Sequence, residues 1–137
     1  MGTWGIKSFE DDVAVDWLED LYDSDPEAFF RHCLDLTGHD YLEHMACIGI
    51  VCTAEMLHGL LLEPRAGLPD TAMEWFEQHR ELDVQPFVPD AINGLNRVIG
   101  PQSEMTELWQ DDGDRFGEWQ AHIQDLIVRL QAVAPTP

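Results

Sequence analysis

Residues 41–62 read YLEHMACIGIVCTAEMLHGLLL. Apolar side chains fall on nearly every side of a helix built from this stretch, which is typical of a helix buried at the centre of a bundle. The stretch is also long enough to cross a membrane. However, Glu55 and His58 interrupt it, and an acidic side chain at the centre of a bilayer costs on the order of 3 kcal/mol. The stretch therefore predicts a central buried helix over residues 40–62 and no transmembrane segment.

Amphipathic segments and helix-ending residues on both sides of this stretch predict an all-α fold. No alternating run is long enough to indicate a β-strand. We expect a compact single-domain bundle of five to seven helices over residues 1–137, with an extended aromatic N-terminal arm over 1–9 and a frayed tail over 134–137. The predicted boundaries are an N-cap at Asp25 followed by Pro26, loops over 63–69 and 82–89 closed by caps at Asp70 and Asp90, and a break over 111–114.

The charge balance is extreme, with 27 Asp and Glu against 7 Lys and Arg and a formal net charge of -20. Nucleic acids and anionic membranes are both bound through Lys and Arg, so the sequence predicts neither as a partner. An acidic surface attracts cationic surfaces, which indicates a basic protein as the partner. The alternative is that the acidity serves only solubility or the habitat of the organism.

The first predicted helix concentrates this charge on one face. Asp12, Asp16, Glu19, Asp20 and Asp23 lie there at helical spacing. An acidic helix face is either solvated or a docking surface for a basic partner. These five residues are therefore the candidate binding residues.

The three cysteines, Cys33, Cys47 and Cys52, form no disulfide framework, since their number is odd and no C-x-x-C spacing occurs. On one helix, Cys47 and Cys52 point about 140° apart and cannot bond to each other. We expect reduced core thiols. The N-terminus also lacks the regions of a signal peptide, and the two observations together predict a cytoplasmic location.

The pair Glu55 and His58 places a carboxylate and an imidazole on adjacent turns of one helix face. That spacing can supply two metal ligands in helical bundles, although di-iron bundles need two such pairs and this sequence has one. His44 lies about 16 Å away along the helix and cannot bind the same ion. Candidates for a further ligand are His32, His79, His122, Glu10 and Asp12.

The alternative interpretation of Glu55 is structural. A buried carboxylate must be paired or protonated, and a tryptophan N–H or a histidine would serve as its partner. Nucleophilic catalysis has no support, because the sequence has no G-x-S-x-G elbow and no glycine-rich phosphate loop. We therefore expect no cofactor, with a divalent metal at Glu55 and His58 as the alternative.

The opening of the chain carries a family resemblance. Residues 1–5 (MGTWG), residues 9–12 (FEDD) and residues 14–17 (AVDW) resemble the start of a bacterial family catalogued as domain of unknown function 4259. Lys7 and Asp11 stand where that family usually has glycine and asparagine. The resemblance implies a small bacterial helical protein and brings no activity, cofactor or catalytic residue.

Three functional hypotheses follow. The first is a non-enzymatic protein-interaction or regulatory module, of the kind that neutralises a toxin, with an acidic surface that binds a basic partner. The second is a metal-dependent bundle enzyme with Glu55 and His58 as ligands. The third is a homodimer that associates through exposed aromatic residues among Trp4, Trp109 and Trp119.

Overall fold

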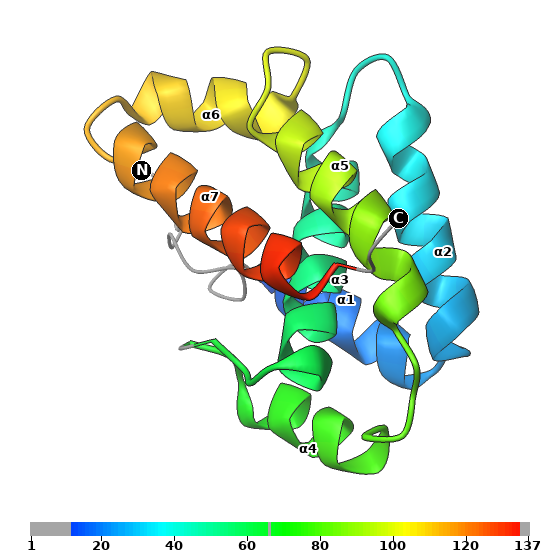
Figure 1. The fold of residues 1–137 in the computed structure, drawn as a ribbon. Coiled ribbons are helices and arrows are strands. Elements are labelled where there is room, and N and C mark those ends of the chain that lie inside the picture. The colour runs from blue at the N-terminus through cyan, green and yellow to red at the C-terminus, as the bar shows by residue number, and fades with distance from the viewer. Residues whose placement is uncertain (1–11, 66, 135–137) are drawn as a thin grey trace.

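Helix α3 (His44–Leu61) runs through the middle of the molecule in the computed structural model, which describes residues 12–65 and 67–134 (Figure 1). Every residue from Ala46 to Gly59 is buried. Among the described residues, α3 alone is long and apolar enough to cross a membrane by length and composition, and 78% of that window is buried inside the fold. The other helices therefore cover its apolar surface, as predicted for a central bundle helix.

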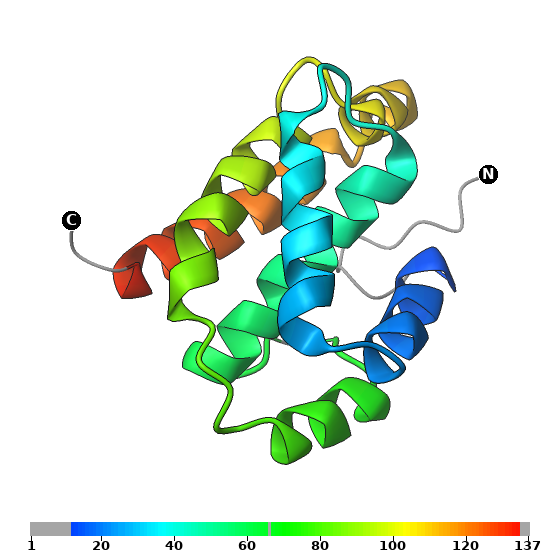
Figure 2. The same cartoon turned by 90° about the vertical axis from the view of Figure 1, so that its right-hand side faces the viewer.

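Six further α-helices surround α3 in the described part of the chain. Helices α1 (Asp12–Tyr22), α2 (Pro26–Asp35), α5 (Val88–Val98) and α7 (Phe116–Val133) pack along it. Helices α4 (Asp70–Gln78) and α6 (Glu104–Asp112) lie at opposite ends of the bundle (Figures 1 and 2). Two 3-10 turns, η1 (Leu36–Gly38) and η2 (Gln85–Phe87), precede the loop before α3 and helix α5 respectively. The predicted all-α class with five to seven helices is confirmed.

The link between the start of α3 and the start of α6 shortens the predicted central helix. Leu42 and Ser103 form an isolated β-bridge, and no longer strand occurs in residues 12–65 and 67–134. The Leu42 N–H donates to the Gln102 carbonyl at 2.9 Å, and the Glu104 N–H donates to the Leu42 carbonyl at 2.8 Å. Because these backbone groups pair across the chain, α3 begins at His44 and not at residue 40.

The predicted helix caps have mixed outcomes. Asp25 caps α2 as expected, since its Oδ2 accepts a hydrogen bond from the Ala28 N–H at 3.0 Å. Asp70 is no cap but the first residue of α4, after Pro69. The predicted cap at Asp90 is also wrong, because α5 begins at Val88 with Pro89 in its first turn. Proline is tolerated there because the first-turn N–H groups have no partner within the helix.

Several predictions fall on residues outside the described part. They are the aromatic arm over 1–9, the residues Glu10 and Asp11, and the end of the tail over 135–137. Asp12 is the first residue of α1, and its side chain is not described.

The aromatic residues near the end of the chain lie inside the protein. Trp109 on α6 and Trp119 on α7 are buried, and their rings stack with centroids 5.9 Å apart and planes 9° apart. The expectation that these two tryptophans are exposed dimer contacts is therefore wrong. Their apolar surface joins α6 to α7, next to the predicted break, where Gly113 adopts a φ of 77°. The three cysteines are buried and free, as predicted.

Gly59 near the end of α3 tests the packing of the core. A Cβ atom at this position would overlap the ring of the buried Phe76 on α4. We expect Gly59→Ala to lower the free energy of unfolding by about 1–3 kcal/mol, because overpacking outweighs the better helix propensity of alanine. Urea denaturation followed by circular dichroism measures the change.

Gly117 on α7 provides the matched control, since a Cβ atom there has no neighbour within 4 Å. Gly117→Ala should raise the free energy of unfolding by up to about 1 kcal/mol through helix propensity alone. Equal effects of the two substitutions would contradict the close contact between α3 and α4.

Candidate functional site

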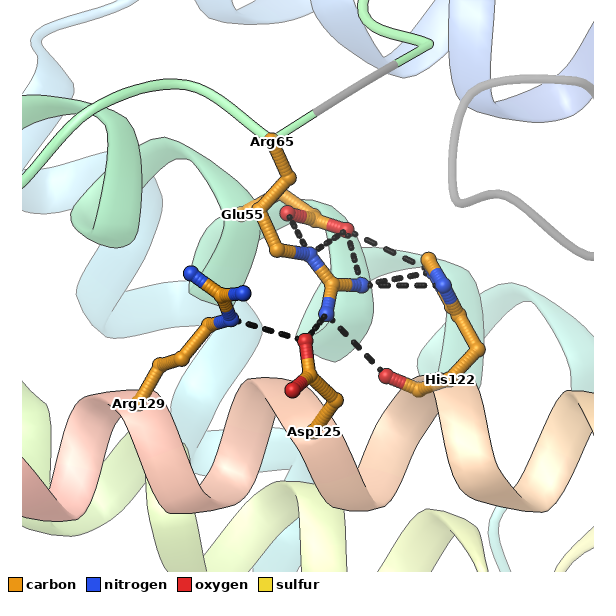
Figure 3. A network of polar contacts seen from close by, with 5 residues as sticks. All are labelled: Glu55, Arg65, His122, Asp125 and Arg129. Atoms are coloured by element: carbon orange, nitrogen blue, oxygen red, sulfur yellow. Dashed lines mark hydrogen bonds and ion pairs between the residues drawn. The ribbon is translucent and has the colours of Figure 1, made fainter.

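The side chain of Arg65 connects the end of α3 to α7 inside the protein. Arg65 lies in the loop after α3, and its side chain is only 8% exposed. Its Nε donates to Glu55 Oε1 at 3.1 Å and its Nη2 donates to Glu55 Oε2 at 2.9 Å (Figure 3). The Glu55 side chain is 1% exposed. The buried carboxylate on the central helix therefore has a bidentate, charge-assisted partner.

The same guanidinium reaches α7 with its remaining N–H groups. Nη1 donates to the His122 carbonyl at 3.2 Å and to Asp125 Oδ2 at 3.0 Å, and Nη2 lies 2.7 Å from His122 Nε2. Asp125 Oδ2 also accepts a hydrogen bond from Arg129 Nε at 2.8 Å. Burial alone would raise the pKa of Asp125, but the bonds and charges of Arg129 and Arg65 together lower it. The five side chains in Figure 3 form one polar network between α3, the Arg65 loop and α7.

A cavity of about 340 Å³ adjoins this network. Its lining comprises His58, Glu63, Pro64, Arg65, His122, Asp125 and Arg129.

His58 is the unusual member of this lining. It is fully buried, and neither ring nitrogen makes a hydrogen bond with a described residue. The backbone of Glu63 approaches the ring but falls outside hydrogen-bond geometry. Burial lowers the pKa of His58, with Glu55 and the Glu63 backbone opposing the shift and Arg65 and Arg129 adding to it. The lowered pKa favours the neutral imidazole, which offers one donor and one acceptor.

The structure places the predicted metal ligands in different settings. Glu55 and His58 lie one turn apart on α3 as predicted, but both Glu55 oxygens accept hydrogen bonds from Arg65. Of the further candidates, His122 is the one beside Glu55, with 3.6 Å between His122 Nε2 and Glu55 Oε2. His79 instead stacks on Trp75 with centroids 4.2 Å apart.

His32 lies away from this network, on the exposed side of α2. Glu10 and the side chain of Asp12 lie outside the described residues. Within residues 12–65 and 67–134, no group of three His, Cys, Asp or Glu side chains is placed to hold a metal ion.

Arg65 is the residue that sequence reasoning missed. A tryptophan N–H or a histidine was expected as the partner of Glu55, and His122 fits the second expectation. The main partner is an arginine ten residues further along the chain. The sequence contained one signal: it has only seven basic residues, and Arg65 is the basic residue nearest in sequence after the central helix. A buried carboxylate on that helix therefore had few cations to pair with.

The acidic face of α1, taken here as Asp16, Glu19, Asp20 and Asp23, lies away from the Arg65 network. All four residues are exposed, and none of their side chains forms an ion pair with a described residue. The predicted position of these residues on one solvent-exposed helix is confirmed, and their binding role remains a prediction.

A surface groove of about 420 Å³ adjoins this acidic face, between α1, α2 and the start of α3. Buried apolar residues such as Trp17, Cys33 and Ala46 form part of its lining, and acidic residues such as Asp20 and Glu43 lie beside them. Tyr41 and Met45 also line the groove and are 40% and 66% exposed. The groove thus combines apolar surface with negative charge.

The fold and these two sites define a small, acidic helical protein with one buried ionic network and one acidic surface groove. No curated protein and no solved structure matches the chain. Residues 2–122 match the family described as "Domain of unknown function (DUF4259)", and the chain belongs to that family.

Removing the cation of the buried network should destabilise the protein. We expect Arg65→Met to lower the free energy of unfolding by about 3–5 kcal/mol, because it leaves the Glu55 carboxylate buried without its charged partner. The double variant Glu55→Leu/Arg65→Met should recover most of this loss, since it removes both charges. Urea denaturation of the wild type and both variants measures the effect, and an Arg65→Met protein as stable as the wild type would contradict it.

The metal hypothesis has its own test. Because Arg65 occupies both oxygens of Glu55, we expect purified, tag-free protein to contain less than one zinc, iron or manganese ion per chain. Elemental analysis measures the content. His58→Gln is the informative variant, because it leaves the ion pair of Glu55 intact. Stoichiometric metal in the wild type that disappears in His58→Gln would favour the metal-dependent enzyme.

Proposed function

We propose that this chain is a non-enzymatic protein-interaction module whose acidic α1 face binds a basic segment of a partner protein. The observation that carries the proposal is the position of Asp16, Glu19, Asp20 and Asp23. These carboxylates are exposed on one helix and have no ion-pair partner among the described residues. Unpaired surface charge of one sign is available to a partner of the opposite sign.

The groove beside α1 supplies what charge alone lacks. Interfaces gain most of their affinity from a few apolar or aromatic side chains that are buried in pockets, and charges around them set specificity and association rate. Asp20 belongs both to the acidic face and to the groove lining. The matching partner segment therefore carries one apolar side chain flanked by lysines or arginines.

The net charge of -20 supports a partner of opposite charge over a second copy of the same chain. Two such copies repel each other at long range, whereas a cationic partner is steered toward the acidic surface. A homodimer would need an apolar contact strong enough to overcome this repulsion. A regulatory role, including the neutralisation of a basic toxin, fits a module of this kind, and we propose the cytoplasm as its location.

The test uses a labelled synthetic peptide in which several lysines flank one leucine. We expect saturable binding in fluorescence anisotropy that weakens about tenfold or more between low salt and about 0.3 M salt, because the attraction is screened. The variant Asp16→Asn/Glu19→Gln/Asp20→Asn should weaken binding at low salt by at least about tenfold.

The control variant Glu81→Gln/Asp111→Asn/Asp114→Asn neutralises the same number of exposed carboxylates on other parts of the molecule. It should leave the affinity within about twofold of the wild type, since the screened field of distant charges contributes little. Equal losses in the two variants would show that net charge alone attracts the peptide. That result would overturn the proposed face.

A further inference from the structure

The cavity between the end of α3 and α7 contains hydrogen-bonding groups that the fold itself does not use. His58 lines it and is fully buried, yet neither ring nitrogen has a hydrogen-bond partner among the described residues. Buried polar groups in native proteins are nearly always hydrogen-bonded to protein, water or ligand. A buried imidazole that faces a cavity of about 340 Å³ therefore points to something that binds in the cavity.

The charged groups of the lining differ in how far they are already engaged. All three nitrogens of the Arg65 guanidinium donate to Glu55, His122 or Asp125. Arg129 uses only Nε, and its two terminal nitrogens point away from the network in Figure 3. Glu63 is exposed and forms no ion pair with a described residue. One cation and one carboxylate thus remain available beside His58.

We propose that this cavity binds a small zwitterion of the amino-acid type. The ligand carboxylate pairs with the terminal nitrogens of Arg129, and the ligand ammonium pairs with Glu63. His58 forms a hydrogen bond with the polar atoms between these two charges, as either donor or acceptor. The site lies between α3 and α7 and shares no residue with the acidic face or its groove.

The charges favour a zwitterion over an ion of either sign. The net charge of -20 repels a simple anion, and the guanidinium groups of Arg65 and Arg129 repel a simple cation. A ligand with both charges and no net charge avoids both penalties. The ammonium group also gains from the end of α3 at Leu61, because the carboxyl end of a helix carries partial negative charge.

The size of the cavity limits the ligand. Pockets for small molecules usually span about 300–1,000 Å³, and this cavity lies near the lower bound. An amino acid with a short side chain fits this volume, and a nucleotide or a longer peptide does not.

The test follows the assigned ring resonances of His58 by NMR while L-alanine is added to the full-length protein. We expect saturable shifts in the wild type and at least about tenfold weaker binding in Arg129→Gln and in Glu63→Gln, because each variant removes one charge partner. Arg80→Gln and Glu81→Gln alter exposed charges outside the cavity and should leave the affinity unchanged.

Single-charge probes separate a zwitterion site from a simple ion site. Acetate alone and ethylamine alone should each bind at least about tenfold more weakly than L-alanine. Acetate that binds as tightly as L-alanine would overturn the zwitterion in favour of an anion site. The absence of any saturable shift at His58 with L-alanine would also overturn the proposal. A normal circular dichroism spectrum of each variant shows that lost binding does not result from unfolding.

Discussion

The ion pair between Glu55 and Arg65 constrains the whole arrangement around the central helix. Glu55 lies in the part of α3 where every residue is buried, so its charge requires compensation inside the protein. The cation comes from the loop that follows α3, which fixes the path of the chain directly after the helix. Because the same guanidinium also binds His122 and Asp125, it fixes α7 against α3. One arginine thereby determines how the first and last thirds of the chain meet.

This dependence explains why some features could be predicted from the sequence and others could not. The burial of α3 follows from its apolar composition, and the cap at Asp25 follows from the local sequence Ser-Asp-Pro-Glu. Both are local properties. The partner of Glu55, the β-bridge at Leu42 and the stacking of Trp109 on Trp119 depend on which segments meet in space. No local pattern encodes such contacts.

The errors in the predicted helix boundaries have a common cause as well. Asp70 and Asp90 were expected to cap helices because aspartate favours that position, yet both lie inside a first turn. Aspartate is favourable there too, since its negative charge interacts with the positive end of the helix dipole. Residue type therefore indicated the correct end of each helix but not the residue at which it begins. Pro89 shifted the predicted start of α5 for the same reason, because proline both ends loops and begins helices.

The stacked pair Trp109 and Trp119 has an optical consequence. Two nearly parallel indole rings with centroids 5.9 Å apart couple their electronic transitions, which gives a near-ultraviolet circular dichroism signal that separate tryptophans lack. One ring belongs to α6 and the other to α7, on the two sides of Gly113. The signal therefore reports whether this one joint is closed, independently of the helix content of the rest of the molecule. The protein thus contains its own spectroscopic probe of the α6–α7 corner, with no added label.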